Sequence, residues 1–221
     1  MRRNYERIGA ATGAFFVIAI LVGGAMEGGH LERGPTIVNR VGLIWALLGF
    51  AAFLVFVGYL HRVLRRAEGP DGWLATVSLG AGLLYLAIKV GSAAPIVVAG
   101  YRIDELTPDL SRTLVDLNDA AFVVSGMMFG LFAVAAAAAC LAHRVLPRWL
   151  GWFGLASGLL TLAAGIVGVV DPMNYNPMPF LGGLLWTLIA STLLAVRRQR
   201  IAQPENDSAG RGARAGSVAG P

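Results

Sequence analysis

Six long apolar runs constrain this chain more than any other feature of its sequence. They cover residues 8–26, 41–60, 73–98, 120–142, 149–170 and 180–196. A helix needs about 20 apolar residues to cross the ~30 Å hydrocarbon core of a bilayer, and these runs meet or approach that length. Their apolar residues are continuous rather than alternating, which is typical of segments that face lipid. The runs predict an all-α fold, a polytopic bundle of six transmembrane helices within residues 1–200.

The composition excludes a soluble globular domain. Hydrophobic residues make up 56% of the chain and charged residues 14%, and the mean hydropathy is +0.65. Average soluble proteins carry about 25% charged residues, so this chain has too little polar material to cover a water-facing surface. The formal net charge of +5 does not indicate a nucleic-acid partner, because the basic residues flank the apolar runs. The partner that the composition predicts is the lipid bilayer.

Basic residues alternate between the connections, and this alternation predicts the topology. Thirteen of the eighteen basic residues fall in the N-terminal segment, the second and fourth connections and the tail. Four fall in the first and third connections, and Lys89 lies inside an apolar run. The positive-inside rule places the more basic side in the cytoplasm. We therefore predict a multi-pass protein of the cell (plasma) membrane with cytoplasmic N- and C-termini.

The two ends of the chain are interpreted differently. The first run is longer than the apolar region of a signal peptide and no A-x-A cleavage site follows it, so we treat it as a span. Residues 201–221 are rich in Gly, Ser, Ala, Pro and charge, which predicts a disordered cytoplasmic tail.

Local signals on the outer side predict where helices begin and bend. Thr107, followed by Pro108 and Asp109, predicts a helix that begins at Pro108. This helix either lies on the outer membrane surface or continues into the fourth run. Pro95 should kink the third helix or mark its outer end. The prolines within residues 171–179 predict a tight outer turn.

Lys89 has the clearest functional implication. It is flanked by apolar residues on both sides, and an ammonium at the bilayer centre costs about 2.5–3.5 kcal/mol on insertion scales. Counting from Trp73 at the inner interface places Lys89 about 24 Å along the helix, in the outer part of the core, where its side chain could snorkel to the headgroups. A span centred further along the run would instead place Lys89 near the midplane, where it would need a carboxylate.

Candidate partners of Lys89 lie at the same outer level. The fourth run begins beside Asn118 and Asp119, the fifth ends at Asp171, and the first ends at Glu27. We predict a polar site in which Lys89 meets Asp119, with Asn118 adjacent and Glu27 or Asp171 contributing. Such a cluster would be either an ion pair that locks helices together or a site that handles a ligand or a proton.

Catalytic and cofactor signals are missing from the sequence. The motifs of zinc proteases, serine hydrolases, P-loop proteins and Rossmann dinucleotide-binding proteins are all absent. The three histidines and the single Cys140 do not suggest a metal or haem site, so we predict no metal and no cofactor. No catalytic residue is assigned, and the sequence leans away from an enzyme.

Small residues recur at spacings that let helix backbones approach closely. The pairs are Gly9 with Gly13, Gly126 with Gly130, and Gly154 with Gly158. They indicate either helix packing within one chain or a homodimer formed through small-residue helix faces.

Two stretches add a resemblance to a known kind of protein. Residues 117–122 (LNDAAF) enter the fourth run, and residues 146–154 (LPRWLGWFG) enter the fifth. Together with the six-span layout they resemble uncharacterised six-span integral membrane proteins of actinobacteria, of the domain-of-unknown-function type. The resemblance implies a fold and no activity.

Three functional classes follow from these observations. A non-enzymatic membrane protein with a structural, regulatory or partner-binding role is favoured by the missing catalytic motifs and the glycine spacings. A small transporter or permease-like protein with an outer-half polar site around Lys89 is the alternative. An intramembrane enzyme would need several polar groups converging in one pocket.

Overall fold

The computed structural model describes residues 2–27, 37–102, 105–171 and 175–215. Their helices are α1 (Arg2–Glu27), α2 (Ile37–Glu68), α3 (Leu74–Tyr101), α4 (Pro108–His143), α5 (Arg148–Val170) and α6 (Met178–Ala215). The described residues contain no β-strand. The all-α prediction is confirmed, and five of the six predicted runs lie within one helix each, while the run 73–98 begins one residue before α3.

All six helices are long and apolar enough to cross a membrane. Many large apolar side chains point outward from them, among them Leu48 on α2, Leu84 on α3 and Leu160 on α5, each about half exposed or more. In water such a surface would drive aggregation, whereas in a bilayer it is the surface that contacts lipid tails. The prediction of a multi-pass membrane protein is therefore confirmed.

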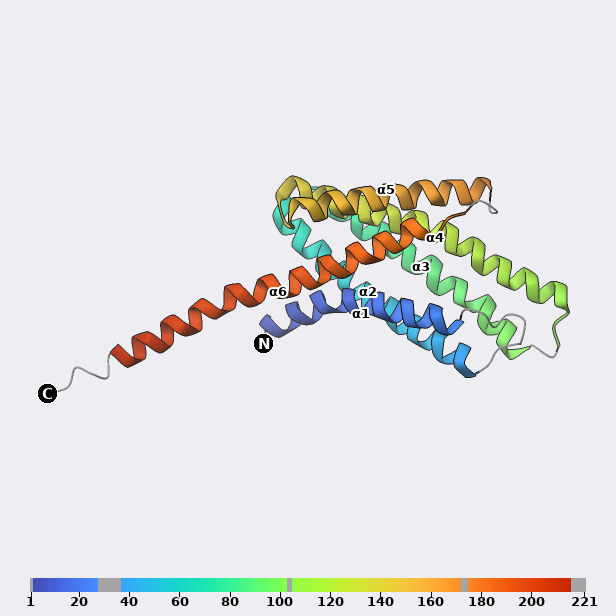
Figure 1. Cartoon of the computed structure of the whole chain (residues 1–221), viewed down its shortest axis with the longest axis horizontal. Helices are drawn as coiled ribbons and strands as arrows, with labels where there is room; N and C mark the ends of the chain where they lie inside the picture. Colours follow the sequence, from blue (N-terminus) through green and yellow to red (C-terminus); the bar gives the residue numbers. More distant parts are fainter. Residues whose placement is uncertain (1, 28–36, 103–104, 172–174, 216–221) are drawn as a thin grey trace.

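Consecutive helices pack side by side, and α6 closes the series on α1. The most extensive contacts join α1 to α2, α3 to α4, and α4 to α5. Smaller contacts join α2 to α3, α5 to α6, and α6 to α1, and α4 also touches α2 and α6. Figure 1 shows α6 crossing from the level of α4 and α5 towards α1. This arrangement makes α4 the most central helix of the bundle.

Aromatic rings from several helices fill the interior. The Phe53 ring centroid of α2 lies 4.4 Å from that of Phe16 on α1 and 5.5 Å from that of Tyr85 on α3. Tyr85 in turn lies 5.1 Å from Phe129 on α4. Each such pair is worth about 0.5–1.5 kcal/mol beyond the burial of its area. These ring contacts therefore fix the position along the bundle axis at which the side chains of α3 pack against α4.

A serine of α6 is inserted into the backbone of α1. The Ser191 hydroxyl accepts a hydrogen bond from the Ala14 N–H over 2.9 Å and donates one to the Ala10 carbonyl oxygen. In a regular helix those two backbone groups would bond to each other. Insertion of a side chain at this point is a known cause of helix bending, and α1 follows a curved course in Figure 1. The contact ties the last helix of the bundle to the first.

The connection between α2 and α3 is built by two charged side chains. The Glu68 carboxylate accepts hydrogen bonds from the Ala75 N–H over 3.1 and 3.2 Å, which caps the first turn of α3. The Arg65 guanidinium donates to the carbonyl oxygens of Gly72 and, over 2.7 Å, of Pro70. Helix α2 therefore extends beyond the apolar run that ends at residue 60, because its last charged turns hold this connection.

The outer-side predictions for α3 and α4 have clear outcomes. Helix α4 begins at Pro108, and the Thr107 hydroxyl caps it by accepting from the Leu110 N–H over 3.4 Å. It continues without a break for 36 residues, about 54 Å, so it runs directly into the fourth span and exceeds the ~30 Å core. Pro95 lies inside α3, which continues to Tyr101, so this proline does not mark the outer end of the helix.

The C-terminal segment is helical as far as Ala215. Helix α6 extends to Ala215, whereas the composition of residues 201–221 predicts disorder. Figure 1 shows this part of α6 projecting away from the other helices. An isolated polar helix is marginal in water because its stability rests on local hydrogen bonds. Disorder of this tail stays a prediction.

Candidate functional site

One face of α3 turns small and polar residues toward the bundle interior. They recur at spacings of four and three, which keeps them on one side of a helix: Ser78, Gly82, Tyr85, Lys89 and Ser92. Four of them are buried, and Lys89 is half-buried. Lys89 thus belongs to the interior stripe of α3 rather than to its lipid-facing side.

The Lys89 ammonium lies against α4. Its Nζ is 5.0 Å from the centroid of the Phe122 ring. A cation over an aromatic face is attracted by about 0.5–1 kcal/mol at exposed sites and about 2 kcal/mol when desolvated. One turn further along α3, the Ser92 hydroxyl donates to the Lys89 carbonyl oxygen over 2.9 Å. The charge is therefore held at the contact between α3 and α4.

The length of α3 refines the depth of Lys89. The apolar span of this helix runs from Leu74 to Val98, so its middle residue is Leu86. Lys89 follows three residues later, about 4.5 Å along the axis. A bilayer centred on Leu86 would place Lys89 near the midplane, the second of the two depths considered from the sequence, and the depth of Lys89 stays a prediction.

Phe122 belongs to a group of rings near the α5–α6 connection. Its centroid lies 5.4 Å from that of Phe180 on α6 and 6.0 Å from that of Tyr175, which precedes α6, with both pairs edge-to-face. Phe122 itself is half-buried, whereas Phe180 is buried. The ring beneath the Lys89 ammonium is therefore held in place by two further aromatic side chains.

Tyr175 occupies a slot that two glycines leave open. A Cβ at Gly168 of α5 would stand 2.6 Å from Cδ2 of the tyrosine ring, and a Cβ at Gly126 of α4 would stand 3.6 Å from its hydroxyl. Partial burial raises the pKa of the Tyr175 phenol above its ordinary range. The tyrosine thus remains neutral near pH 7 and links the α5–α6 connection to the Lys89 and Phe122 contact.

Two of the predicted polar partners lie on α4 close to Phe122. Asp119 precedes Phe122 by three residues and Asn118 by four, so all three share one face of the helix. Asp119 is exposed and Asn118 is half-buried. The structure therefore brings Asn118 and Asp119 to the turn beside the ring that Lys89 contacts. A direct pairing of Lys89 with Asp119 stays a prediction.

The other two predicted partners lie at helix ends. Asp171 is exposed, and its N–H donates to the Val167 carbonyl oxygen over 2.7 Å at the end of α5. Glu27 is the last residue of α1, and its side chain lies outside the described residues. Their contribution to a site with Lys89 stays a prediction as well.

The side chains around Lys89 are of the kinds that bind small polar or charged ligands. It combines a half-buried ammonium, aromatic ring edges and a neutral phenol, with a carboxylate one helical turn away. These groups can hold an anion, a carboxylate or a polar headgroup. Among the residues that the structure describes, no group of three or more His, Cys, Asp or Glu side chains could hold a metal ion.

The glycine spacings belong to helix crossings within the chain. A Cβ at Gly130 of α4 would stand 2.8 Å from the Leu162 backbone nitrogen and 2.9 Å from the Gly158 carbonyl oxygen of α5. Gly154 faces the Trp186 indole of α6, which donates to the Leu150 carbonyl oxygen over 3.1 Å. On the other side of the bundle, Gly9 and Gly13 of α1 face the Tyr59 and Phe56 rings of α2, respectively. The six glycines therefore have intramolecular neighbours.

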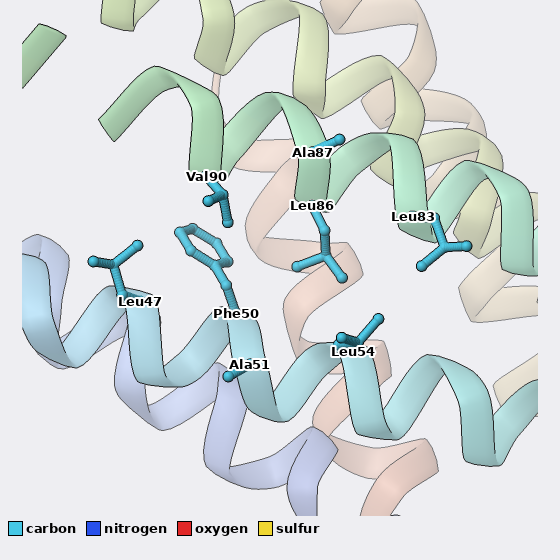
Figure 2. A pocket seen from close by; sticks show the side chains of 8 residues that line it. All are labelled: Leu47, Phe50, Ala51, Leu54, Leu83, Leu86, Ala87 and Val90. Atoms are coloured by element: carbon cyan, nitrogen blue, oxygen red, sulfur yellow. The ribbon is translucent and has the colours of Figure 1, made fainter. Parts of the chain in front are cut away.

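A concave feature lies between α2 and α3, away from the interior stripe of α3. It is a groove of about 350 Å³ with an entirely apolar lining. Its residues are Leu47, Phe50, Ala51, Leu54, Leu83, Leu86, Ala87 and Val90. In Figure 2 the side chains of α2 that point toward α3 are Leu47, Phe50 and Leu54, and those of α3 that point toward α2 are Leu83, Leu86 and Val90. We call it the α2–α3 groove.

Several of these features could not be predicted from the sequence. Phe122 stood in the stretch LNDAAF, but nothing in one sequence shows that its ring meets Lys89 of another helix. Tyr175 lay in the proline-rich connection, where only the turn was predicted. The α2–α3 groove has no sequence signal, because its lining residues look like any lipid-facing leucine or alanine.

Comparison with known protein families identifies a match over most of the chain. A family model described as a domain of unknown function (DUF4386) matches residues 11–196, which include nearly all of the membrane bundle. No curated protein and no solved structure matches the chain.

Proposed function

The chain belongs to the DUF4386 family, and from this premise we propose that it is a non-enzymatic membrane protein with a ligand- or partner-binding role. In this proposal Lys89 holds an anionic group within the bundle. The observation that carries it is the Lys89 ammonium on the interior face of α3, 5.0 Å from the Phe122 centroid. An intramembrane lysine is costly to insert, so its presence on an interior face is by default a functional hypothesis.

Three further observations support a binding role. Phe122 is fixed by Tyr175 and Phe180, so the groups around the ammonium are already arranged before any ligand arrives. Asn118 and Asp119 lie on the same face of α4 as that ring and can set which anions are accepted. The α5–α6 connection contributes Tyr175, so a change in this connection would reach the site directly.

A thermal-shift experiment tests the binding role. The purified protein is unfolded in detergent at constant ionic strength with inorganic phosphate or succinate as probe, because a ligand that binds the folded state stabilises it. We expect either probe to raise the Tm of the wild type and of Lys89→Arg, but not of Lys89→Met. Arg102→Met is the matched control, since Arg102 is an exposed outer cation paired with Glu105 at 3.9 Å. An equal shift in Lys89→Met would refute the proposal, and so would the absence of a shift in the wild type.

Chemical labelling gives a second measurement that does not depend on a variant. Lys89 is the single lysine of the sequence, so an amine-reactive reagent reports on it alone apart from the N-terminal amine. Phosphate or succinate bound at the ammonium should slow labelling of Lys89. Labelling at an unchanged rate would count against the site even if Lys89→Met failed to fold.

A small transporter or permease-like protein is the second candidate. It is favoured by the interior stripe from Ser78 to Ser92, which places polar groups on both sides of the span middle. In sealed vesicles, transport predicts that an impermeant amine reagent reaches Lys89 from either side. Labelling from one side alone would favour binding over transport.

The orientation and location of the protein are part of the proposal. The distribution of basic residues supports cytoplasmic N- and C-termini in the cell (plasma) membrane of a bacterium. A reporter enzyme active only outside the cytoplasm, fused after Pro221, should be inactive. The same reporter fused within residues 28–36 should be active, and the reverse pattern would overturn the orientation.

The small-residue faces support packing within one chain. The six glycines behind the homodimer prediction have intramolecular neighbours, so a second copy would need a different surface. We propose that the glycines close the bundle, and the molar mass of the purified protein by light scattering tests the alternative. A dimer abolished by substitution of these glycines without loss of helix content would contradict the proposal.

A further inference from the structure

The six helices are not packed against one another equally tightly. Contacts are extensive between α1 and α2, between α3 and α4, and between α4 and α5, whereas α2 meets α3 over a smaller surface. Helix α6 contacts α1 and α5 to a similar, smaller extent. The bundle therefore consists of two closely packed bodies, the α1–α2 pair and the α3–α5 unit, which meet along a looser seam and are bridged by α6.

Close backbone approach at small residues explains why each body is compact. In the α1–α2 pair, a Cβ at Gly23 would stand 2.9 Å from the Gly42 carbonyl oxygen, and a Cβ at Gly49 would stand 2.9 Å from the Ala19 Cβ. In the α3–α5 unit, α4 and α5 cross at Gly130 in the same manner. Helices in such contact lose the van der Waals packing of their backbones when they separate. Each body should therefore move as one piece.

Several hydrogen bonds hold the two bodies together at one end of the bundle. We call it the connection end, because the α2–α3 and α4–α5 connections lie there. His61 Nδ1 of α2 donates to the Ala75 carbonyl oxygen of α3 over 3.0 Å, and the Ala75 N–H donates to the Glu68 carboxylate. The Ser191 hydroxyl of α6 is hydrogen-bonded to the α1 backbone near the start of the α1 span, which lies at the same end.

Away from the connection end, the seam contains aromatic rings and the α2–α3 groove. The Phe53 ring of α2 lies edge-to-face with Tyr85 of α3 and Phe132 of α4, at centroid distances of 5.5 and 5.3 Å. The Phe16 ring of α1 meets Tyr85 edge-to-face at 6.4 Å. The groove of about 350 Å³ shows that the facing side chains of α2 and α3 do not interlock there. Separation in this region costs ring and dispersion contacts and leaves the hydrogen bonds of the connection end intact.

We propose that the α1–α2 pair swings as a rigid body about the connection end, so that the seam opens at the other end of the bundle. Hinge motions of this kind occur where two packed bodies are joined through a few residues. Opening separates Phe16 and Phe53 from Tyr85 and uncovers the interior stripe of α3, to which Lys89 belongs. The movement does not depend on what Lys89 binds.

Distances between spin labels test this movement. The full-length chain with Cys140→Ala receives pairs of cysteines at exposed positions, is labelled with a nitroxide and reconstituted in lipid nanodiscs, and the separations are measured by double electron–electron resonance. Leu48→Cys with Val124→Cys spans the seam far from the connection end. Ile8→Cys with Thr76→Cys spans it at the connection end, and Ile8→Cys with Leu48→Cys lies within the α1–α2 pair. We expect two separations for the first pair and one for each of the others.

Weakening the ring contacts of the seam should favour the open form. Phe53→Leu removes the ring that joins α2 to Tyr85 and Phe132, so the longer of the two separations should gain population. Phe15→Leu is the matched control, because the Phe15 ring meets Trp45 at 6.0 Å within the α1–α2 pair. The control should leave the two populations as they are in the wild type.

A single separation for Leu48 with Val124 in the wild type and in both variants would overturn the proposal. Equal broadening of all three pairs would also overturn it, because it would indicate loose packing throughout the bundle. So would a changed separation of Ile8 and Leu48 in Phe53→Leu, since the α1–α2 pair would then not move as one body. The measurement contains no phosphate or succinate, so a failure of these probes to bind leaves its outcome unaffected.

Discussion

The Lys89 ammonium of α3 lies 5.0 Å from the centroid of the Phe122 ring of α4. This contact joins two of the most extensively packed helices, and Lys89 lies three residues from the middle of the apolar span of α3. The contact also explains how a charge is tolerated within an apolar helix: the ammonium faces the bundle interior and rests on an aromatic face, instead of facing lipid tails. Tyr175 and Phe180 hold the ring in position.

Removing the Phe122 ring should weaken the bundle through Lys89. We expect Phe122→Leu to lower the free energy of unfolding by about 0.5–2 kcal/mol beyond the loss of apolar contacts, the range for cation–π pairs. A double-mutant cycle with Lys89→Met, measured by denaturant unfolding in detergent, isolates this coupling. If the two substitutions are additive within about 0.3–0.5 kcal/mol, the ring does not stabilise the ammonium.

The inserted serine should matter more than its exposed neighbour. Ser191→Ala removes both hydrogen bonds to α1, and interhelical hydrogen bonds in membranes are worth about 0.6 kcal/mol on average and up to about 1.7. The control is Thr192→Ala, because the exposed Thr192 hydroxyl donates only to the Leu188 carbonyl oxygen of its own helix. Thermal unfolding should show a lower Tm for Ser191→Ala than for Thr192→Ala. Equal values would show that the insertion contributes no stability.

A methyl group at the crossing of α4 and α5 should be poorly tolerated. In Gly130→Ala the new Cβ would meet backbone atoms of Leu162 and Gly158 at 2.8–2.9 Å, so the helices must separate. Overpacking of this kind costs about 1–3 kcal/mol. Gly58→Ala on α2, with nothing within 4 Å of its Cβ, should instead stabilise by up to about 1 kcal/mol. Unfolding measurements that rank the two variants in the opposite order would contradict the crossing.

Alkaline conditions should reveal the burial of Tyr175. Burial raises the pKa of its phenol above the ordinary value of 10.0, so the unfolded chain releases this proton before the folded chain does. Its contribution to the free energy of unfolding is therefore unchanged below about pH 10 and falls as the pH rises above it. Unfolding of the wild type and of Tyr175→Phe between pH 8 and 11 measures this difference. A difference that stays constant with pH would mean that Tyr175 is not buried.

Some residues of the candidate site can be identified from the sequence, and others only from the structure. Lys89 is identifiable from the sequence because a single charge inside an apolar run stands out under any packing. Asn118 and Asp119 could be placed at the outer start of the fourth span by counting residues. Phe122 and Tyr175 could not, because contacts between different helices depend on how each helix is rotated about its axis.

The sequence by itself determined the number of spans, the start of α4 at Pro108 and the expected orientation. These follow from run length, capping chemistry and the distribution of arginine, which act locally along the chain. Only the tertiary structure decided that Lys89 faces inward, that Gly130 and Gly158 meet at one crossing, and that a groove lies between α2 and α3. A spanning helix must be apolar on nearly every side, so its sequence carries little information about which side meets a neighbour and which meets lipid.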